Sequence, residues 1–139
     1  MARVVQFPSP PHLRLRQIAG QNPEGVITKW LKSFPSARAR FRIRVQNLAK
    51  IPRAEWHIKQ FRSLGGGLFE IKWEDTKPFR ALGYDDSDGY FVMVLGCTHK
   101  DDVYDPQSCI DTARKRMMEA KNGDWNIIEY PLLPPQEFD

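Results

Sequence analysis

The chain has 139 residues, with 21 Lys or Arg, 17 Asp or Glu and a formal net charge of +4. This length is typical of one domain with its own hydrophobic core. No apolar run approaches the roughly 20 residues that a membrane-spanning helix needs, and the N-terminal apolar stretch is too short for a signal peptide. We therefore expect residues 1–139 to form a single cytoplasmic domain without membrane contact.

The two cysteines, Cys97 and Cys109, belong to no CxxC motif and to no Cys/His group. Isolated cysteines in a cytoplasmic protein are usually reduced. The sequence therefore predicts two ordinary buried thiols, no metal site and no cofactor.

Positive charge is concentrated in the first half of the chain. Residues 1–62 contain 13 Lys or Arg and only Glu24 and Glu55 as acidic residues, a net charge of +11, whereas the remainder carries 8 basic and 15 acidic residues, a net charge of −7. Such a basic half suits a polyanion or an acidic partner. The alternative is a solvated cationic helix surface that the acidic half balances.

The first 34 residues predict a possible edge strand and one helix. Residues 4–7 are β-prone and end at a proline, and the following residues up to 21 have no clear pattern, so residues 1–21 form a basic arm. Asn22, Pro23 and Glu24 are typical of a helix start. An apolar stripe predicts that this helix continues to about Ser33, and its members are Val26, Ile27, Trp30, Leu31 and Phe34.

The segment from 37 to 50 fits two secondary structures. A strand is indicated by four arginines that alternate strictly with apolar residues: Arg38, Arg40, Arg42 and Arg44. A helix is indicated by an apolar stripe with helical spacing: Ala37, Phe41, Val45 and Leu48. A capping Ser36 and the Ala/Arg content favour the helix. In either conformation the arginines repel one another unless something acidic covers them.

Residues 65–100 predict a β-meander of three strands. Residues 68–73 alternate between two faces, 79–84 follow after a hairpin-length loop, and 90–97 are almost wholly apolar behind the turn formers at 85–89. Residues 53–64 are a connection anchored by Trp56 and Phe61. The three glycines at 65–67 precede a strand instead of a helix, which argues against a phosphate-binding loop.

The last third predicts a loop, a helix and a tail. After a polar loop, Asp105 and Pro106 open a helix that stops at Asn122 and Gly123, and residues 124–139 form a Pro-rich extended tail. The fold class is therefore α+β, an antiparallel meander packed against two N-terminal helices, with a C-terminal helix.

Several strings resemble those of RelE/ParE-superfamily toxins, in the HigB-like and phage-derived branch. GLFEIK at 67–72 is similar to the G-L-Y-E-I-R strand of that branch, and the resemblance covers residues 35–121. It implies two N-terminal helices on an antiparallel sheet and a neighbouring gene for an antitoxin. The other matching strings are TrpHis at 56–57, PheArg at 79–80, ThrHisLys at 98–100, and AspPro at 105–106 followed by IDTARKRM.

The resemblance implies cleavage of mRNA, commonly in the ribosomal A site, by attack of a ribose 2′-OH on the adjacent phosphate. This chemistry needs a base, an acid and cations for the extra phosphorane charge. Glu70, on the same face as Lys72, is a further acid or base candidate. Arg80 is the strongest candidate, because a guanidinium matches phosphate geometry. The residues that match the family's catalytic positions are Lys72, Arg80 and Lys100 as cations, with His99 or Tyr104 for proton transfer.

Structural alternatives stand beside these roles. Arg80 fits an ion pair with Asp85 or Asp86, and His99 fits a structural role at a strand end. Lys72 and Lys77 fit ordinary solvent-facing strand positions. The loop length leaves the match of Tyr104 to the family's C-terminal tyrosine open. Nucleic-acid contacts are expected from five basic residues: Arg38, Arg40, Arg42, Arg44 and Lys77.

The chain departs from the branch after Lys100, where Asp101 and Asp102 replace a second lysine. Two carboxylates beside a phosphate site oppose RNA binding. The leading hypothesis is a type II toxin, a metal-independent and ribosome-dependent mRNA endoribonuclease that a helix-turn-helix antitoxin holds inactive. The alternatives are a non-enzymatic relative that binds a protein target, as gyrase-poisoning members do, or a phage or prophage protein that binds nucleic acid or a host factor.

Overall fold

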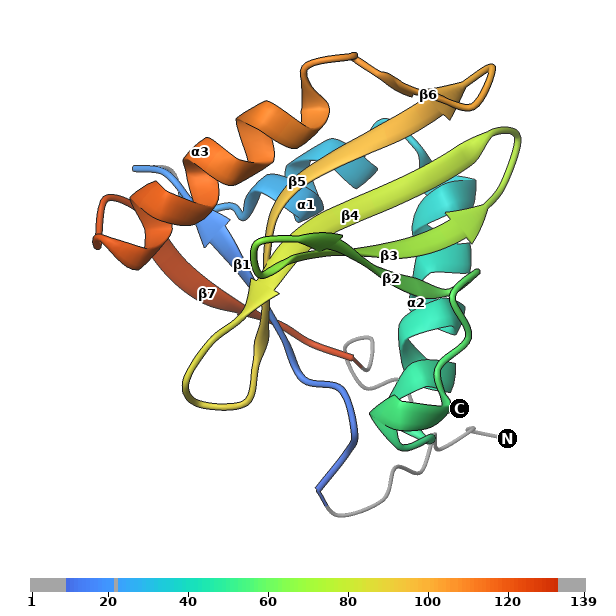
Figure 1. Ribbon diagram of the computed structural model, residues 1–139, viewed down its shortest axis with the longest axis horizontal. Helices are drawn as coiled ribbons and strands as arrows, with labels where there is room; N and C mark the ends of the chain where they lie inside the picture. Colours follow the sequence, from blue (N-terminus) through green and yellow to red (C-terminus); the bar gives the residue numbers. More distant parts are fainter. Residues whose placement is uncertain (1–9, 22, 133–139) are drawn as a thin grey trace, which may run out of the picture.

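The computed structural model describes residues 10–21 and 23–132, which form one seven-stranded sheet with helices on both faces (Figure 1). The strand order is β2-β3-β4-β5-β1-β7, with β6 pairing with β5 beyond this path. All strand pairs are antiparallel except β1 with β5, which confirms the α+β class. The bounds are β1 (Leu15–Ala19), α1 (Val26–Leu31), α2 (Pro35–Ala49), the 3-10 helix η1 (Arg53–Glu55), β2 (Phe61–Gly65), β3 (Leu68–Glu74), β4 (Pro78–Asp85), β5 (Phe91–Lys100), β6 (Val103–Asp105), α3 (Cys109–Lys121) and β7 (Asn126–Tyr130).

The predicted meander is present as β3, β4 and β5, with a fourth strand in front of it. The predicted connection at 53–64 ends in β2, which forms a hairpin with β3. Gly65, Gly66 and Gly67 at this turn all have positive φ values between 63° and 86°, a conformation that favours glycine. The three glycines therefore allow the tight turn between β2 and β3.

Four of the strands, β1, β2, β6 and β7, were not expected from the sequence. The segment predicted to be patternless contains β1, which lies between β5 and β7 and is buried over most of its length. The predicted tail from residue 124 begins with β7, which pairs with β1 along all five residues. The predicted edge strand at 4–7 lies outside the described residues.

The helices agree with the sequence in number and differ in their bounds. The helix interpretation of 37–50 is confirmed by α2, which buries the whole predicted stripe. Helix α1 begins at Val26, later than predicted, because the backbone N–H groups of Ile27 and Thr28 both donate to Gln17 Oε1 of β1, each at 3.0 Å. The last helix, α3, begins at Cys109 instead of Asp105. No helix of the described residues is long and apolar enough to cross a membrane.

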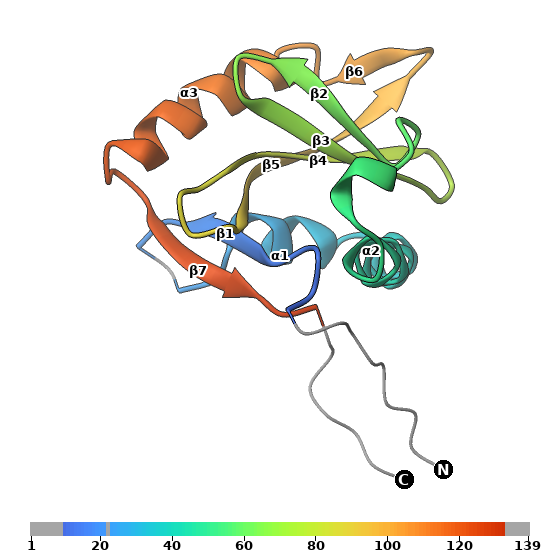
Figure 2. The same ribbon diagram turned by 60° about the horizontal axis from the view of Figure 1, so that its bottom comes forward.

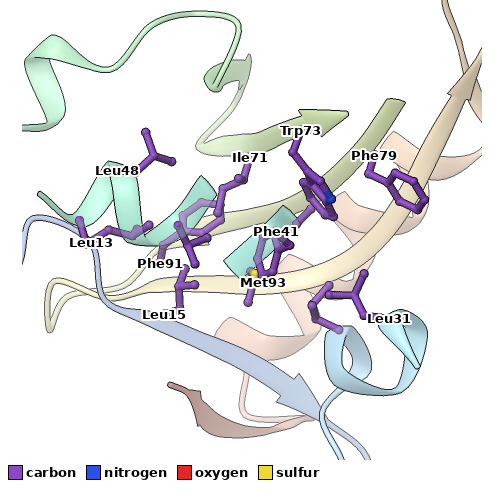
Figure 3. Packing of buried hydrophobic residues seen from close by; sticks show 14 of the residues in the cluster. Leu13, Leu15, Leu31, Phe41, Leu48, Ile71, Trp73, Phe79, Phe91 and Met93 are labelled. Carbon is purple, nitrogen blue, oxygen red and sulfur yellow. The ribbon is translucent and has the colours of Figure 1, made fainter. Parts of the chain in front are cut away.

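Two hydrophobic cores lie on opposite faces of the sheet (Figure 2). Helices α1 and α2 cover one face, where Phe41 packs on Trp73 with ring centroids 4.5 Å apart (Figure 3). Helix α3 covers the other face with Ala113 and Met117. Strands β3, β4 and β5 are therefore buried on both sides, whereas the sequence predicted that one face of residues 68–73 would be in water.

The prediction of two free thiols is wrong. Cys97 and Cys109 form a disulfide bond between β5 and the first residue of α3. No sequence pattern indicates this pairing, because the packing of α3 on the sheet brings the two residues together. Their Cα atoms are 6.6 Å apart.

Candidate functional site

Six polar residues gather on the α3 side of the sheet, beyond the N-terminal end of that helix. Their shared face follows from the strand register, because cross-strand partners project to the same side. We refer to them as the Glu70 cluster. The register pairs its members across neighbouring strands: Arg62 with Glu70, Lys72 with Arg80, and His99 with Tyr104.

The carboxylate of Glu70 is fully buried at the centre of this cluster. Its Oε1 atom lies 3.0 Å from Arg62 Nη2 and 3.5 Å from Arg80 Nε, and its Oε2 atom accepts a hydrogen bond from the Tyr104 hydroxyl. Two cations and a hydroxyl thus offset the desolvation of the carboxylate. Glu70 in turn fixes the positions of both guanidinium groups.

Arg80 has little contact with solvent, since only 6% of its surface is exposed. Its Nη1 atom donates to the carbonyl of Phe79 at 2.8 Å. The alternative partners suggested by the sequence are engaged elsewhere: Asp85 pairs with Arg53 and Asp86 pairs with Arg16, each at 2.7 Å.

Lys72 and His99 both lie in a positively charged environment. Partial burial and the neighbouring Arg80 lower the pKa of the Lys72 ammonium and also that of the His99 imidazole. The Nε2 atom of His99 is buried and has no hydrogen-bond partner among the described residues. At neutral pH the ring is therefore neutral.

Tyr104 holds its proton more tightly than a free phenol. Burial and its hydrogen bond to Glu70 raise the pKa of Tyr104 to about 12. Its ring lies edge-on to that of His99, with centroids 4.3 Å apart. In this arrangement Tyr104 donates to Glu70 and orients His99, and it does not act as a base near neutral pH.

Lys100 and Lys77 lie away from the cluster. Lys100 follows His99 directly in β5, so its side chain projects to the opposite face, and it is exposed. Lys77 is exposed beside the ring of Phe34, 5.5 Å from its centroid. Of the three cations that match the family's catalytic positions, Lys72, Arg80 and Lys100, the structure brings only the first two together.

The four α2 arginines, Arg38, Arg40, Arg42 and Arg44, lie across the sheet from the Glu70 cluster. Arg40 pairs with Asp75 at 3.0 Å, and Arg44 Nε donates to the carbonyl of Lys72 at 2.9 Å. A groove of about 230 Å³ runs between this helix and β3, and Ile43 in its wall is 58% exposed. The four predicted nucleic-acid-binding arginines are thus on a surface separate from the Glu70 cluster, which holds every predicted catalytic residue except Lys100.

Asp101 and Asp102 form the turn between β5 and β6. Their φ values are 52° and 63°, the left-handed conformation that the tight hairpin turn requires and that Asp tolerates better than most residues. Both are exposed at the hairpin tip. The left-handed conformation of the turn therefore explains why two aspartates follow Lys100.

Arg62 is the member of the cluster that the sequence did not single out. Its strand was interpreted as a connection, so no alternation placed it opposite Glu70. Within residues 10–21 and 23–132 no three His, Cys, Asp or Glu side chains are grouped as metal ligands.

Comparison with known proteins gives no relative of this chain. No family model matches it, and no curated protein and no solved structure matches it. The resemblance to the RelE/ParE superfamily rests on the short residue strings described above.

Proposed function

We propose that the protein is a HigB/RelE-like toxin of a type II toxin-antitoxin system that cleaves mRNA on the ribosome. The supporting observation is the Glu70 cluster, which combines three cations, a buried carboxylate and a neutral imidazole on one face of the sheet. These are the group types that attack of a 2′-OH on a phosphate requires.

Each step of the cleavage has a candidate residue. His99 Nε2 takes the proton of the 2′-OH, whose oxygen then attacks the phosphorus. Arg80 and Arg62 stabilise the extra negative charge of the phosphorane. Lys72, whose pKa is lowered by burial and by Arg80, donates a proton to the departing 5′-oxygen. The products are a 2′,3′-cyclic phosphate and a 5′-hydroxyl.

The charge distribution suggests how such an enzyme is controlled. Residues 1–62 carry a net charge of +11. Four of their positive charges are the α2 arginines, which lie away from the Glu70 cluster. A cognate helix-turn-helix antitoxin with an acidic or helical segment would bind this basic surface.

The test is cleavage of a translated mRNA by purified protein, mapped by primer extension. Lys72→Ala should reduce the cleavage rate on the order of 100-fold, a usual effect of removing a general acid. Lys100→Ala is the matched control, because it makes the same chemical change on the other face. Arg80→Lys keeps the charge, loses the bidentate geometry and should also be slow.

Two outcomes would contradict the enzyme proposal. One is the absence of cleavage by the wild-type protein on translating ribosomes. The other is equal toxicity of wild type and Arg80→Ala in cells, which would favour a protein target such as gyrase.

A second candidate function is nucleic-acid binding without catalysis. It is favoured by the position of the α2 arginines, since Arg38 and Arg42 are exposed and lie across the sheet from Arg80. Harmless expression, together with a shift of duplex DNA that weakens steeply with salt and is lost in Arg38→Ala/Arg42→Ala, would support it.

A further inference from the structure

The tip of the β5–β6 hairpin carries two members of the Glu70 cluster and has few neighbours. Strand β4 pairs with β5 only as far as Thr98, and His99 beyond it pairs only with Tyr104 of β6. Among the described strands β6 has no partner other than β5. In Figure 1 the β5–β6 tip and the β3–β4 turn both lie at the upper right. The main sheet therefore does not by itself fix where His99 lies.

The Cys97–Cys109 disulfide joins the root of this hairpin to the rest of the fold. Cys97 is the cross-strand partner of Arg80 and lies two residues before His99, on the same face. Cys109 is the first residue of α3, so the bond closes a loop over a sequence separation of 12 that includes both His99 and Tyr104.

We infer that the Cys97–Cys109 disulfide is a clamp that positions His99 and Tyr104 over Arg80. The side chain of Tyr104 also ties the hairpin to the sheet, through its hydrogen bond to Glu70 and its packing against the core on the α3 side. Without the covalent bond, α3 and β5 can separate at their closest point, and the loop that they hold widens. The inference rests on the proposed function only for its effect on catalysis.

Because the disulfide is buried, it is expected to act as a permanent clamp and not as a switch that reductants readily reverse. Cys97 is 2% exposed and Cys109 is fully buried, in a core with Leu82 and Ala113. Thiol–disulfide exchange needs access of a thiolate to one sulfur. A dithiol therefore reaches this bond only when α3 lifts from the sheet, and the folded oxidised protein keeps it in mild reductant.

The test compares three samples of the full chain. The first is the oxidised protein. The second is the same protein refolded in excess dithiol, which reduces the cystine to two thiols and is itself oxidised to a cyclic disulfide. The third is Cys97→Ala/Cys109→Ala, in which alanine leaves no buried polar group. The second sample is the matched control, because it keeps both sulfurs and lacks only the bond.

Two measurements report the clamp without any nuclease activity. Amide hydrogen exchange over residues 98–106 should rise on the order of tenfold in both bond-free samples, while exchange in the β2–β3 hairpin stays unchanged. The pKa of the His99 ring is lowered in the oxidised protein by burial and by Arg80. In the bond-free samples this pKa, followed by NMR, should return toward its ordinary value. Equal exchange in all three samples, or an equal rise across the whole chain, would overturn the inference.

Cleavage gives the functional readout. We expect kcat to fall about tenfold in the bond-free samples with KM unchanged, because a small displacement of a catalytic group slows the chemical step. Equal kcat in all three samples would overturn the positioning role. If no sample cleaves mRNA while exchange changes as expected, the proposed function fails and the clamp stands.

Discussion

The imidazole of His99 faces three cations and one carboxylate: Arg62, Lys72, Arg80 and Glu70. Burial and Arg80 lower the pKa of His99 below its ordinary value of 6.5. As the pH falls, the unfolded chain therefore takes up this proton before the folded protein does. The contribution of His99 to stability is full above pH 6.5 and is lost as the pH falls from there through the folded pKa.

This sign gives a prediction for His99→Gln. The wild type should lose more of its free energy of unfolding than the variant when the pH is lowered from about 8 to about 5, because glutamine does not titrate. Urea unfolding at both pH values measures the difference. His12 and His57 are present in both proteins and therefore do not affect the comparison. Equal losses in the two proteins would show that the ring is not held neutral.

Glu70 carries a second prediction at the same scale. Glu70→Ala leaves the buried Arg80 without its carboxylate and should lower the free energy of unfolding by about 3–5 kcal/mol. The matched control is Asp85→Ala, which breaks the exposed pair with Arg53 and should cost less than about 1 kcal/mol. Chemical denaturation of both variants measures the two free energies of unfolding. A loss for Glu70→Ala as small as that for Asp85→Ala would contradict an electrostatic centre at Glu70.

At the scale of elements, α2 shows how burial decides between two sequence patterns. Its arginines alternate like a strand, but Phe41 and Val45 are fully buried against the sheet while Ile43, which alternation would place beside them, is exposed. Phe41→Ala should cost about 3–5 kcal/mol of stability. Ile43→Ala should change it by less than about 0.5 kcal/mol. Thermal unfolding of the pair tests the assignment, and a larger loss from Ile43→Ala would reverse it.

The strands of the meander were predictable because their apolar residues are local and continuous. Strands β1 and β7 were not, since each is only five residues long and pairs with partners distant in sequence. Residues 15–19 are an example, because their pairing with β5 and β7 joins segments more than 70 residues apart. Strands β2 and β6 have near neighbours as partners and were missed because their residues lack a clear strand pattern. The place of Arg62 was missed together with β2, and the disulfide depends on the packing of α3 on the sheet.

For the candidate site, the sequence identified residue types better than their arrangement. Lys72, Arg80, His99 and Tyr104 are together in the structure. Lys100 is separated from them by the alternation of a strand, which becomes visible only when the paired register of β5 and β6 is known. In the sequence, Asp101 and Asp102 are two carboxylates that would oppose RNA binding. In the structure they are the residues of a tight turn.

At the scale of the whole molecule, the sheet divides two basic surfaces. The Glu70 cluster lies on the α3 side and the α2 arginines on the other (Figure 2). The proposed catalysis and the proposed partner binding can therefore be tested separately. Substitutions at Arg38 and Arg42 should weaken binding to an acidic partner. They should leave the pKa of His99 unchanged. Titration of both variants by NMR, with and without an acidic peptide, measures the two effects independently.

The most direct test of the central claim is the chemical nature of the mRNA ends that the protein produces on translating ribosomes. Attack by a 2′-OH at the Glu70 cluster predicts 5′ fragments that end in a 2′,3′-cyclic phosphate, and His99→Gln should lower their yield on the order of 100-fold. Fragments that end in a 3′-hydroxyl, or an unchanged yield from His99→Gln, would contradict the account.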